Sequence, residues 1–278
     1  MRINIHQIKQ MKEHGEKIVM LTAYDYTTAK IIDTAGVPLI LVGDSLGTVV
    51  LGYDSTIPVT MEAMLHHTKA VTRAVRNALV IGDMPFMSYQ VSTEQALANA
   101  ARFIQEAGAQ AVKLEGGVSM ATTVKRIVDC GIPVMGHIGL TPQSIHQLSG
   151  YKAQGKTLEA ARRLLADASA LESAGAFAVV LETIPAELAQ LISRKISIPT
   201  IGIGAGVGCD GQVQVISDML GLFTDFVPKH AKRYARLSDV MSNAVSQYAQ
   251  EVKAGAFPTL KESISIDKDV LAGLEKEA

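Results

Sequence analysis

Cysteine is scarce in this 278-residue sequence, which contains only Cys130 and Cys209 and has no tryptophan. Two distant cysteines make neither the closely spaced pairs of a metal site nor the framework of a small disulfide-rich protein. This scarcity favours a reducing compartment, and we expect a cytoplasmic protein. The first residues, MRINIHQIKQMKEHGEK, alternate apolar and charged side chains and lack the apolar core of a signal peptide.

Net charge and long apolar runs are also lacking. The formal net charge is −1 at pH 7, which provides no basic surface for nucleic acid or for an anionic membrane. No apolar run approaches the length needed to span a bilayer. These absences leave small-molecule chemistry as the expected work of the chain, with no nucleic acid and no membrane as partner.

Hydrophobic residues are abundant, at 48% of the chain, as expected when parallel strands are buried on both faces. Strand-like and helix-like patterns alternate throughout. The predicted strands are residues 18–23, 39–43, 79–82, 111–115, 133–137, 178–182, 200–204 and 225–228. The predicted helices are residues 27–34, 61–75, 93–107, 120–130, 158–174, 186–195, 212–220 and 239–254.

Eight such units close most simply as a (β/α)8 TIM barrel, an α/β fold in a single domain, with a doubly wound open sheet as the alternative. We expect residues 1–260 to form the barrel domain and residues 261–278 to be a charged C-terminal tail with a short helix near 270–277. The N-terminal segment is a candidate cap for the floor of the barrel. The long polar segment 139–157 is typical of a lid over the mouth.

The segment 111–117, AVKLEGG, interrupts an apolar strand with Lys113 and Glu115. These residues share one face because alternate strand residues point the same way. An edge strand with a solvated charged face is the simpler interpretation. The helical patterns on either side instead place this strand in a parallel series covered by helices. Charged residues near its C-terminal end then face the barrel mouth, where catalytic groups collect.

Further carboxylates follow other predicted strands. Asp44 and Asp83 each come after an apolar strand and a glycine, in LVGDS and VIGDMPF. Either residue alone could cap a helix, as we expect Asp25 to do, but the repetition and the presence of Glu115 indicate a shared site. Three carboxylates at one mouth repel one another, and a divalent cation usually neutralises them. All-oxygen ligands favour Mg²⁺.

The fifth and sixth predicted strands end in His137 and Glu182. A single mouth histidine counts against zinc and against an iron site with two histidines. Glu182 follows the apolar run AVVL, and partial burial there suits a general base. A structural, ion-paired glutamate is equally compatible with this position.

Longer motifs carry a resemblance to a known family. They are TAYDYTTAK (22–30), LVGDSLGTVVLGYDSTIPVT (41–60), GDMPFMSYQ (82–90), AVKLEGG (111–117), PVMGHIGLTPQ (133–143), LETIPAELA (181–189) and IGIGAGVGCDGQV (201–213). From about residue 5 to residue 258, the chain resembles the ketopantoate hydroxymethyltransferase family, of the phosphoenolpyruvate-mutase-like barrel superfamily. The differences from the family pattern, at Thr27, Met87 and Thr183, do not involve the metal ligands or the base.

The resemblance implies an enzyme that transfers a hydroxymethyl group from methylenetetrahydrofolate to α-ketoisovalerate, through a Mg²⁺-stabilised enolate. The product, ketopantoate, serves pantothenate and coenzyme A synthesis. The resemblance also implies the site residues: Asp44, Asp83 and Glu115 for Mg²⁺; Asp44, Ser45, Asp83 and Lys113 for the keto acid; Glu182 as proton acceptor; and His137 as a site histidine without a firm role. The family's typical assembly is a homodecamer of two stacked pentamers.

Three alternatives remain open from the residues themselves. Lys113 suits a Schiff-base aldolase, since a strand-end lysine beside a carboxylate can act as a nucleophile. A metal-dependent carbon–carbon lyase acting on a 2-keto acid would need a similar mouth. A barrel that binds a metal or ligand without turnover is the non-enzymatic alternative, and Glu182 counts against it because a pure binder needs no base.

Overall fold

The computed structural model describes residues 2–277 and contains eight parallel strands that close into a barrel. The strands are β1 (Ile18–Thr22), β2 (Leu39–Val42), β3 (Leu79–Asp83), β4 (Ala111–Glu115), β5 (Val134–Gly139), β6 (Ala178–Glu182), β7 (Thr200–Ile203) and β8 (Gly211–Gln214). Each strand pairs with the next in sequence, and β8 pairs with β1. The predicted (β/α)8 barrel is therefore confirmed and the open sheet is excluded.

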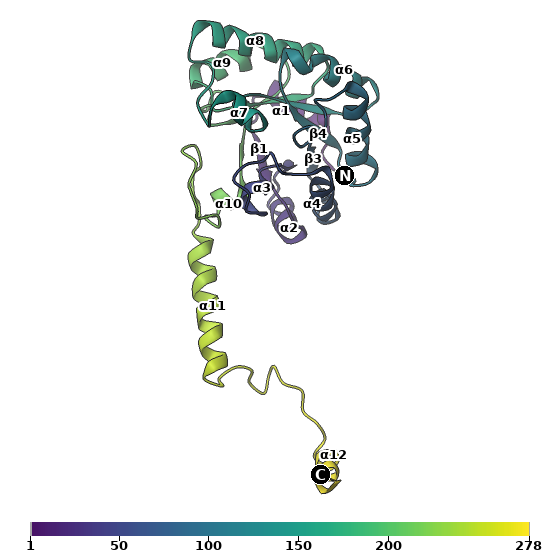
Figure 1. Cartoon of the computed structure of the whole chain (residues 1–278), viewed down its shortest axis with the longest axis vertical. Helices are drawn as coiled ribbons and strands as arrows, with labels where there is room; N and C mark the ends of the chain where they lie inside the picture. Colours follow the sequence, from purple (N-terminus) through teal and green to yellow (C-terminus); the bar gives the residue numbers. More distant parts are fainter. Residues whose placement is uncertain (1, 278) are drawn as a thin grey trace.

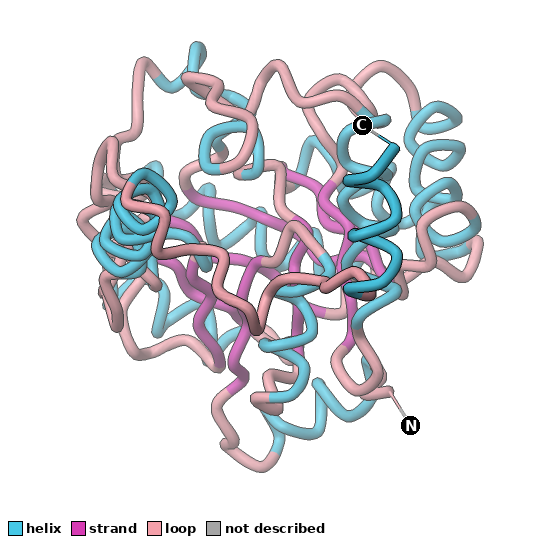
Figure 2. Tube along the Cα trace, turned by 90° about the horizontal axis from the view of Figure 1, so that it is seen from below, coloured by secondary structure: helices cyan, strands magenta, loops and turns pink. Residues whose placement is uncertain are grey.

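The chain has helices around this ring of strands, which lies at the centre of Figure 2, and two more, the last two, that extend away from it in Figure 1. They are α1 (Ile5–Glu13), α2 (Tyr26–Thr34), α3 (Leu46–Val49), α4 (Met61–Ala74), α5 (Thr93–Gln105), α6 (Ala121–Asp129), α7 (Ile145–Leu148), α8 (Leu158–Ser173), α9 (Ala186–Lys195), α10 (Ile216–Met219), α11 (Leu237–Lys253) and α12 (Lys268–Glu277), with short 3-10 helices η1 (Val118–Met120) and η2 (Pro142–Ser144). Asp25 caps α2 as predicted: its Oδ1 accepts a hydrogen bond of 2.8 Å from the backbone N–H of Thr28.

The eighth strand is not where the sequence pattern placed it. We predicted a strand at 225–228 and a helix over 212–220, whereas the structure forms β8 at Gly211–Gln214 and only the short α10 after it. The segment GQVQVISDML spaces its apolar residues as an amphipathic helix does, which explains the error. The start of the segment forms a strand because β1 and β7 would otherwise have unpaired backbone edges, and β8 pairs with both and closes the barrel.

Apolar side chains fill two layers. The larger lies between the strands and the outer helices, and the smaller fills the lower interior of the barrel. Ile8 of α1 is fully buried in this inner layer, together with Met20, Leu39 and Ile81. The N-terminal helix therefore caps the floor of the barrel, as expected.

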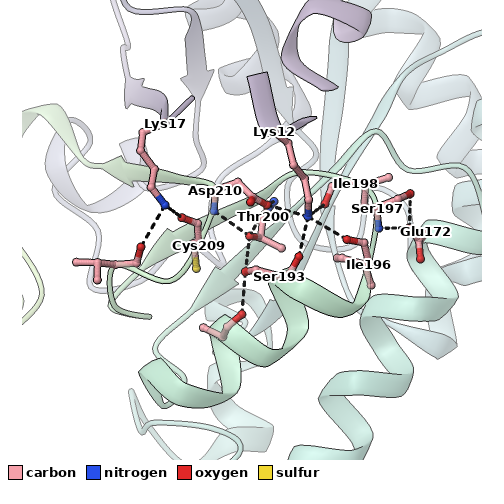
Figure 3. Close-up of polar contacts among 12 residues, drawn as sticks. Lys12, Lys17, Glu172, Ser193, Ile196, Ser197, Ile198, Thr200, Cys209 and Asp210 are labelled. Carbon is pink, nitrogen blue, oxygen red and sulfur yellow. Dashed lines mark hydrogen bonds and ion pairs between the residues drawn. The ribbon is translucent and has the colours of Figure 1, made fainter. Parts of the chain in front are cut away.

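Polar contacts fix this cap in place, as Figure 3 shows. Lys12 Nζ donates to the carbonyl oxygens of Ser193, Ile196 and Ile198 at 2.8, 2.9 and 2.9 Å, and it lies 3.0 Å from Asp210 Oδ2. The three carbonyls lie at and just beyond the end of α9, where backbone acceptors lose their helical partners. The charge of Lys12 is thus fully matched by floor groups.

The burial of β4 settles the interpretation of its charges. Lys113 and Glu115 are 4% and 5% exposed, and β4 pairs with β3 on one side and β5 on the other. An edge strand with a solvated face is therefore excluded. The interior of the mouth holds both side chains.

The C-terminal region differs from the rest of the chain. Helices α11 and α12 contain no buried residue, and in Figure 1 they extend away from the barrel. Helices occur at both positions predicted for this region, but the domain boundary at residue 260 stays a prediction. Across residues 2–277, no helix is both long enough and apolar enough to cross a membrane.

Candidate functional site

A cavity of about 590 Å³ opens at the C-terminal ends of the strands. It is lined by every site residue named from the sequence: Asp44, Ser45, Asp83, Lys113, Glu115, His137 and Glu182. These residues come from five consecutive strands or the turns that follow them, β2 to β6. The parallel barrel brings them together because all its strands end on the same side.

Lys113 pairs with Asp83. Its Nζ donates to Asp83 Oδ1 at 2.7 Å and to Oδ2 at 2.9 Å. The β3–β4 register sets this contact by placing the two residues side by side. Burial alone would lower the pKa of Lys113, but the negative charges of Asp83, Glu115 and Asp44 outweigh burial and raise that pKa. The lysine is therefore a fixed cation at neutral pH.

Asp44 is a buried carboxylate without a cationic partner in the described chain. Its backbone N–H donates to Asp83 Oδ2 at 3.2 Å, which places the two aspartates side by side. Burial, followed by the negative charge of Asp83, raises the pKa of Asp44 well above its usual range, although Lys113 acts in the opposite direction. The raised pKa of Asp44 therefore reflects its burial first and then the neighbouring carboxylates, which Lys113 does not offset.

Gln143 joins the carboxylates to one another, and sequence reasoning missed it. Its Nε2 donates to Asp44 Oδ2 and to the carbonyl of Met84, both at 2.9 Å. Its backbone N–H donates to Glu115 Oε2 at 3.1 Å. Its Oε1 accepts from Tyr89 Oη at 2.6 Å. Gln143 lies in the motif PVMGHIGLTPQ within the expected lid. The motif could have marked Gln143 as a site residue, but the sequence could not predict its contacts.

His137 lies between two glutamates. Its Nδ1 is 3.4 Å from Glu115 Oε1 and its Nε2 is 3.1 Å from Glu182 Oε2. At these angles neither nitrogen makes an aligned hydrogen bond within the described chain, so the contacts are primarily electrostatic. Burial and the charge of Lys113 lower the pKa of His137, but the two carboxylates outweigh them and raise it to about 9. An imidazolium at neutral pH therefore faces Glu182.

The backbone after Glu182 is strained. Thr183 has a φ of 49°, which is an outlier for a β-branched residue and is typical of functional sites. Two hydrogen bonds hold it there: its N–H donates to the carbonyl of Ile203 at 2.8 Å, and its carbonyl accepts from Gln154 N at 3.0 Å. Gln154 belongs to the segment 139–157, so the segment that we expect to act as a lid is hydrogen-bonded to the residue that follows β6.

Ser45 lies on the opposite side of the acidic cluster. Its Oγ is 2.9 Å from Tyr24 Oη. Tyr24 is 4% exposed, and burial raises its pKa despite the hydrogen bond to Ser45. Tyr24 is therefore neutral at pH 7, and its hydroxyl shares a hydrogen bond with the Ser45 hydroxyl in which either oxygen can be the donor.

The site offers the carboxylate oxygens that Mg²⁺ prefers, but its three carboxylates are not arranged around a single point. Among residues 2–277, no group of three or more His, Cys, Asp or Glu side chains is arranged to hold a metal ion. Mg²⁺ typically takes only one or two protein carboxylates and completes its octahedron with water and substrate oxygens. The adjacent, buried Asp44 and Asp83 fit that requirement. Glu115 is engaged by Gln143 and His137, and both oxygens of Asp83 by Lys113. All three proposed metal ligands therefore stay predictions.

Comparison with known proteins decides the family. The family model described as ketopantoate hydroxymethyltransferase matches residues 2–260. The chain belongs to the ketopantoate hydroxymethyltransferase family. A protein of Dehalococcoides mccartyi named 3-methyl-2-oxobutanoate hydroxymethyltransferase is 70% identical, with 99% of each chain covered. One of the same name from Chloroflexus aurantiacus is 61% identical over 98% of this chain and 96% of that protein. This member of the family is accordingly a transferase.

Solved structures of more distant proteins share the fold of this hydroxymethyltransferase-family chain. A phosphoenolpyruvate phosphomutase from Streptomyces platensis superposes with a TM-score of 0.60 at 15% identity, covering 99% of this chain and 97% of that one. A 2,3-dimethylmalate lyase gives a TM-score of 0.57 at 15% identity, covering 98% and 95%. At such identities the likeness shows a shared barrel and nothing about the reaction.

Proposed function

We propose that this chain transfers a hydroxymethyl group from methylenetetrahydrofolate to α-ketoisovalerate and so forms ketopantoate. The observation that carries the proposal is the placement of Glu182 opposite a buried Asp44–Asp83–Lys113 cluster in one cavity of a chain that belongs to this family. A keto acid needs positive charge at its carboxylate and keto oxygens and a base at its branched carbon. The two sides of the cavity offer these functions separately.

The keto-acid side of the cavity provides both charge and orientation. Lys113 stays protonated and presents a fixed cation, while Ser45, hydrogen-bonded to Tyr24, presents a hydroxyl group. A divalent cation held by Asp44 and Asp83 would stabilise the negative charge that develops on the keto oxygen as the proton leaves. Mg²⁺ is the proposed ion because the ligands are oxygen atoms at a site with excess negative charge.

Glu182 is the proposed proton acceptor. It is only partly buried, its side chain being 14% exposed, so it can meet a substrate that enters the cavity. His137, held 3.1 Å from Glu182 Oε2, orients the carboxylate and compensates its charge before the proton arrives. Glu115 fixes the opposite nitrogen of the imidazole. In this arrangement His137 is a positioning residue.

The overall reaction balances with one water. The branched carbon loses its proton and gains a carbon–carbon bond to the transferred carbon. Both carbon–nitrogen bonds of the donor's methylene group break, so the donor leaves as tetrahydrofolate. Water supplies the new hydroxyl oxygen. Because stray water would consume the activated one-carbon unit, the lid segment, which contributes Leu140, Pro142, Tyr151 and Ala153 to the cavity wall, has a protective role.

The test is formation of ketopantoate from α-ketoisovalerate and methylenetetrahydrofolate by the purified chain, with and without a chelator. Turnover is expected with Mg²⁺, lost on chelation, and restored by added Mg²⁺. Full turnover in thoroughly metal-depleted protein would overturn the metal role while leaving the transfer reaction standing. No product under any condition would overturn the proposed function.

The Schiff-base alternative is tested by borohydride reduction in the presence of α-ketoisovalerate. Lys113 is held between both oxygens of Asp83 and stays protonated, so it is a poor nucleophile. The treated protein should keep its activity and its mass. A substrate adduct on Lys113 would instead establish the aldolase chemistry.

The proposed assembly is the family's decamer. Exposed apolar residues lie along one face of α11 at helical spacing, namely Val240, Met241, Val245, Tyr248 and Val252. Such a face is suited to burial against another chain. Analytical ultracentrifugation should give a mass about ten times that of the single chain, and a monomer at micromolar concentration would contradict the proposal.

A further inference from the structure

The cavity has two unlike halves. The half formed by β2 to β6 carries the acidic cluster, Lys113, His137 and Glu182. The other half is formed by β1, β7, β8 and the segment after α10, and it is mainly apolar. Its lining residues include Thr22, Ile203, Val213, Val215, Phe226 and Pro228, with the polar Asp218, Lys229 and His230 beside them. A small keto acid with polar groups at both ends does not need this second half.

One carboxylate interrupts the apolar half. Asp218 of α10 lines the cavity and is 6% exposed. No hydrogen bond or ion pair to its carboxylate occurs within residues 2–277. Burial raises the pKa of Asp218, while the charges of His230 and Arg233 act against that rise. The carboxylate oxygens of Asp218 are not among the fully enclosed polar atoms, so they are open to the cavity. A ligand that fills this part of the cavity must supply the donors that the carboxylate would otherwise lose.

The position of Asp218 is fixed by the barrel. The backbone N–H of Ile216 donates to Thr22 Oγ1 at 3.0 Å, which anchors α10 to the end of β1. β8, which precedes α10, lies four strands from β4 on the closed ring. Asp218 therefore faces the cavity from the side opposite Lys113 and Glu115, with room for a ligand between them.

An apolar wall with one unsatisfied carboxylate is suited to a flat heterocycle that presents two neighbouring N–H donors. A carboxylate accepts such a pair in bidentate fashion, and these charge-assisted bonds combine strength with orientation. The pteridine ring of the proposed one-carbon donor presents this pair on its 2-amino group and N3–H. Its remaining edges are compatible with the apolar residues of this half.

We propose that Asp218 binds the 2-amino-4-oxopyrimidine edge of the donor's pteridine ring and holds the ring in the apolar half of the cavity. This inference rests on the proposed function for the identity of the donor. It also orients that donor: Lys229 and His230, exposed on the same side of the cavity, lie where the anionic glutamate end would leave the site. The donor's methylene group then points toward the acidic half, where the keto acid is held.

The first test is binding of tetrahydrofolate by calorimetry to the full chain and to Asp218→Asn. Loss of a charge-assisted bidentate contact should weaken binding by about 10- to 100-fold. Asp225→Asn is the matched control, because Asp225 is exposed and does not line the cavity, and it should bind within twofold of the wild type. Unchanged affinity in Asp218→Asn would overturn the proposal.

The second test varies the ligand rather than the protein, so it does not depend on a variant that folds. Wild-type chain should bind the 2-desamino-2-methyl analogue of tetrahydrofolate about 10- to 100-fold more weakly than tetrahydrofolate. Asp218→Asn should bind the two compounds alike. Equal binding of both compounds by the wild type would show that Asp218 does not contact this edge. The same conclusion would follow if the analogue lost as much affinity in Asp218→Asn as in the wild type.

Exchange of the branched-carbon proton of α-ketoisovalerate with deuterated solvent separates this inference from the proposed function. The exchange needs no donor, so Asp218→Asn should retain it within twofold while the KM for methylenetetrahydrofolate rises. Equal loss of exchange in this variant would indicate a merely structural role and overturn the inference. If the wild type formed no ketopantoate yet discriminated the two ligands through Asp218, the proposed function would fail and the ring-binding site would stand.

Discussion

The floor and the mouth of this barrel both bury charged groups, but they treat them in opposite ways. At the floor, Lys12 meets three carbonyl oxygens and Asp210, and Asp210 in turn accepts from the N–H and hydroxyl of Thr200 at 2.8 and 2.9 Å. Every partner there comes from the chain itself. Such a network stabilises the fold and leaves nothing for a ligand to satisfy (Figure 3).

The mouth instead leaves its charges unbalanced. Among the residues that line the cavity, five carboxylates, Asp44, Asp83, Glu115, Glu182 and Asp218, outnumber the buried cationic side chains, Lys113 and His137, while Lys229 and His230 are exposed. Burial, followed by the negative charge of Asp83, raises the pKa of Asp44. We infer that a carboxylate whose partners the chain completes outside the cavity, such as Asp210, is structural, whereas one that the chain leaves incomplete at the cavity, such as Asp44, is available to a ligand. The paired Asp83 and Lys113 are assigned to the site by their place in the cavity and not by missing partners.

The largest effect that tests this difference is expected at Glu182. In Glu182→Gln the side chain keeps its shape but cannot accept a proton, so turnover should fall by at least about 100-fold. Deuterium exchange into α-ketoisovalerate should fall in parallel, while binding of the keto acid persists. Glu187→Gln, exposed on the following helix, is the control. Near-normal exchange in Glu182→Gln would identify another base.

At the floor, Lys12→Met should act on stability alone. Removing the ammonium leaves the partly buried Asp210 and three carbonyls without their donor, which should lower the free energy of unfolding by about 3 kcal/mol. Urea unfolding measures this loss, and Lys30→Met, at an exposed lysine, should change little. The turnover of the folded fraction should equal that of the wild type; a reduced turnover would mean that the floor is coupled to the mouth.

Asp44 and Asp210 offer a matched pair of aspartates. In the metal-free protein at pH 7, Asp44→Asn removes a carboxyl group whose pKa is raised by burial. The free energy of unfolding should therefore rise by about 1 kcal/mol. A carboxyl group whose pKa is raised in the folded protein lowers the stability only at a pH above its pKa in the unfolded chain, near 3.8. The stability gained in Asp44→Asn should therefore vanish as the pH falls below 3.8. Asp210→Asn should instead cost about 2 kcal/mol because it loses a paired charge.

Activity completes this comparison. Asp44→Asn should lose turnover although it gains stability, whereas Asp210→Asn should keep turnover although it loses stability. Thermal unfolding in chelator between pH 4 and 8 gives the stability arm. A loss of stability in Asp44→Asn at pH 7 would show that Gln143 alone satisfies that carboxylate.

The smallest effect is expected at Asp25, an exposed aspartate that follows β1 and whose partners the chain does complete. Both of its carboxylate oxygens accept from Thr28, at 2.8 and 2.7 Å. Asp25→Ala should therefore cost about 1 kcal/mol as a lost helix cap and leave the KM values and the metal dependence unchanged. A large loss of turnover would place Asp25 in the site and weaken the rule that completed partners mean a structural role.

Much of the site was predictable because it lies at strand ends. Asp44 and Asp83 each follow an apolar run and a glycine, and Glu182 ends another such run, so a pattern of local residues placed them at one mouth. The partner of Lys113 was not predictable in this way. The sequence puts Glu115 on the same face two residues away, whereas the β3–β4 register puts Asp83 beside Lys113 and makes the ion pair.

The alternation of short apolar runs with amphipathic helices determined by itself that this chain is an α/β protein of parallel strands with its charged strand ends on one side, and it favoured a (β/α)8 barrel over an open sheet. That information is local, because it depends on periodicity within each element. Tertiary structure alone decided which residues close the barrel as β8 and how Gln143 links Asp44 to Glu115. It also decided that Asp218 lines the cavity without a hydrogen-bond partner among residues 2–277. These features depend on strand register and on contacts between distant segments, which a pattern of neighbouring residues does not encode.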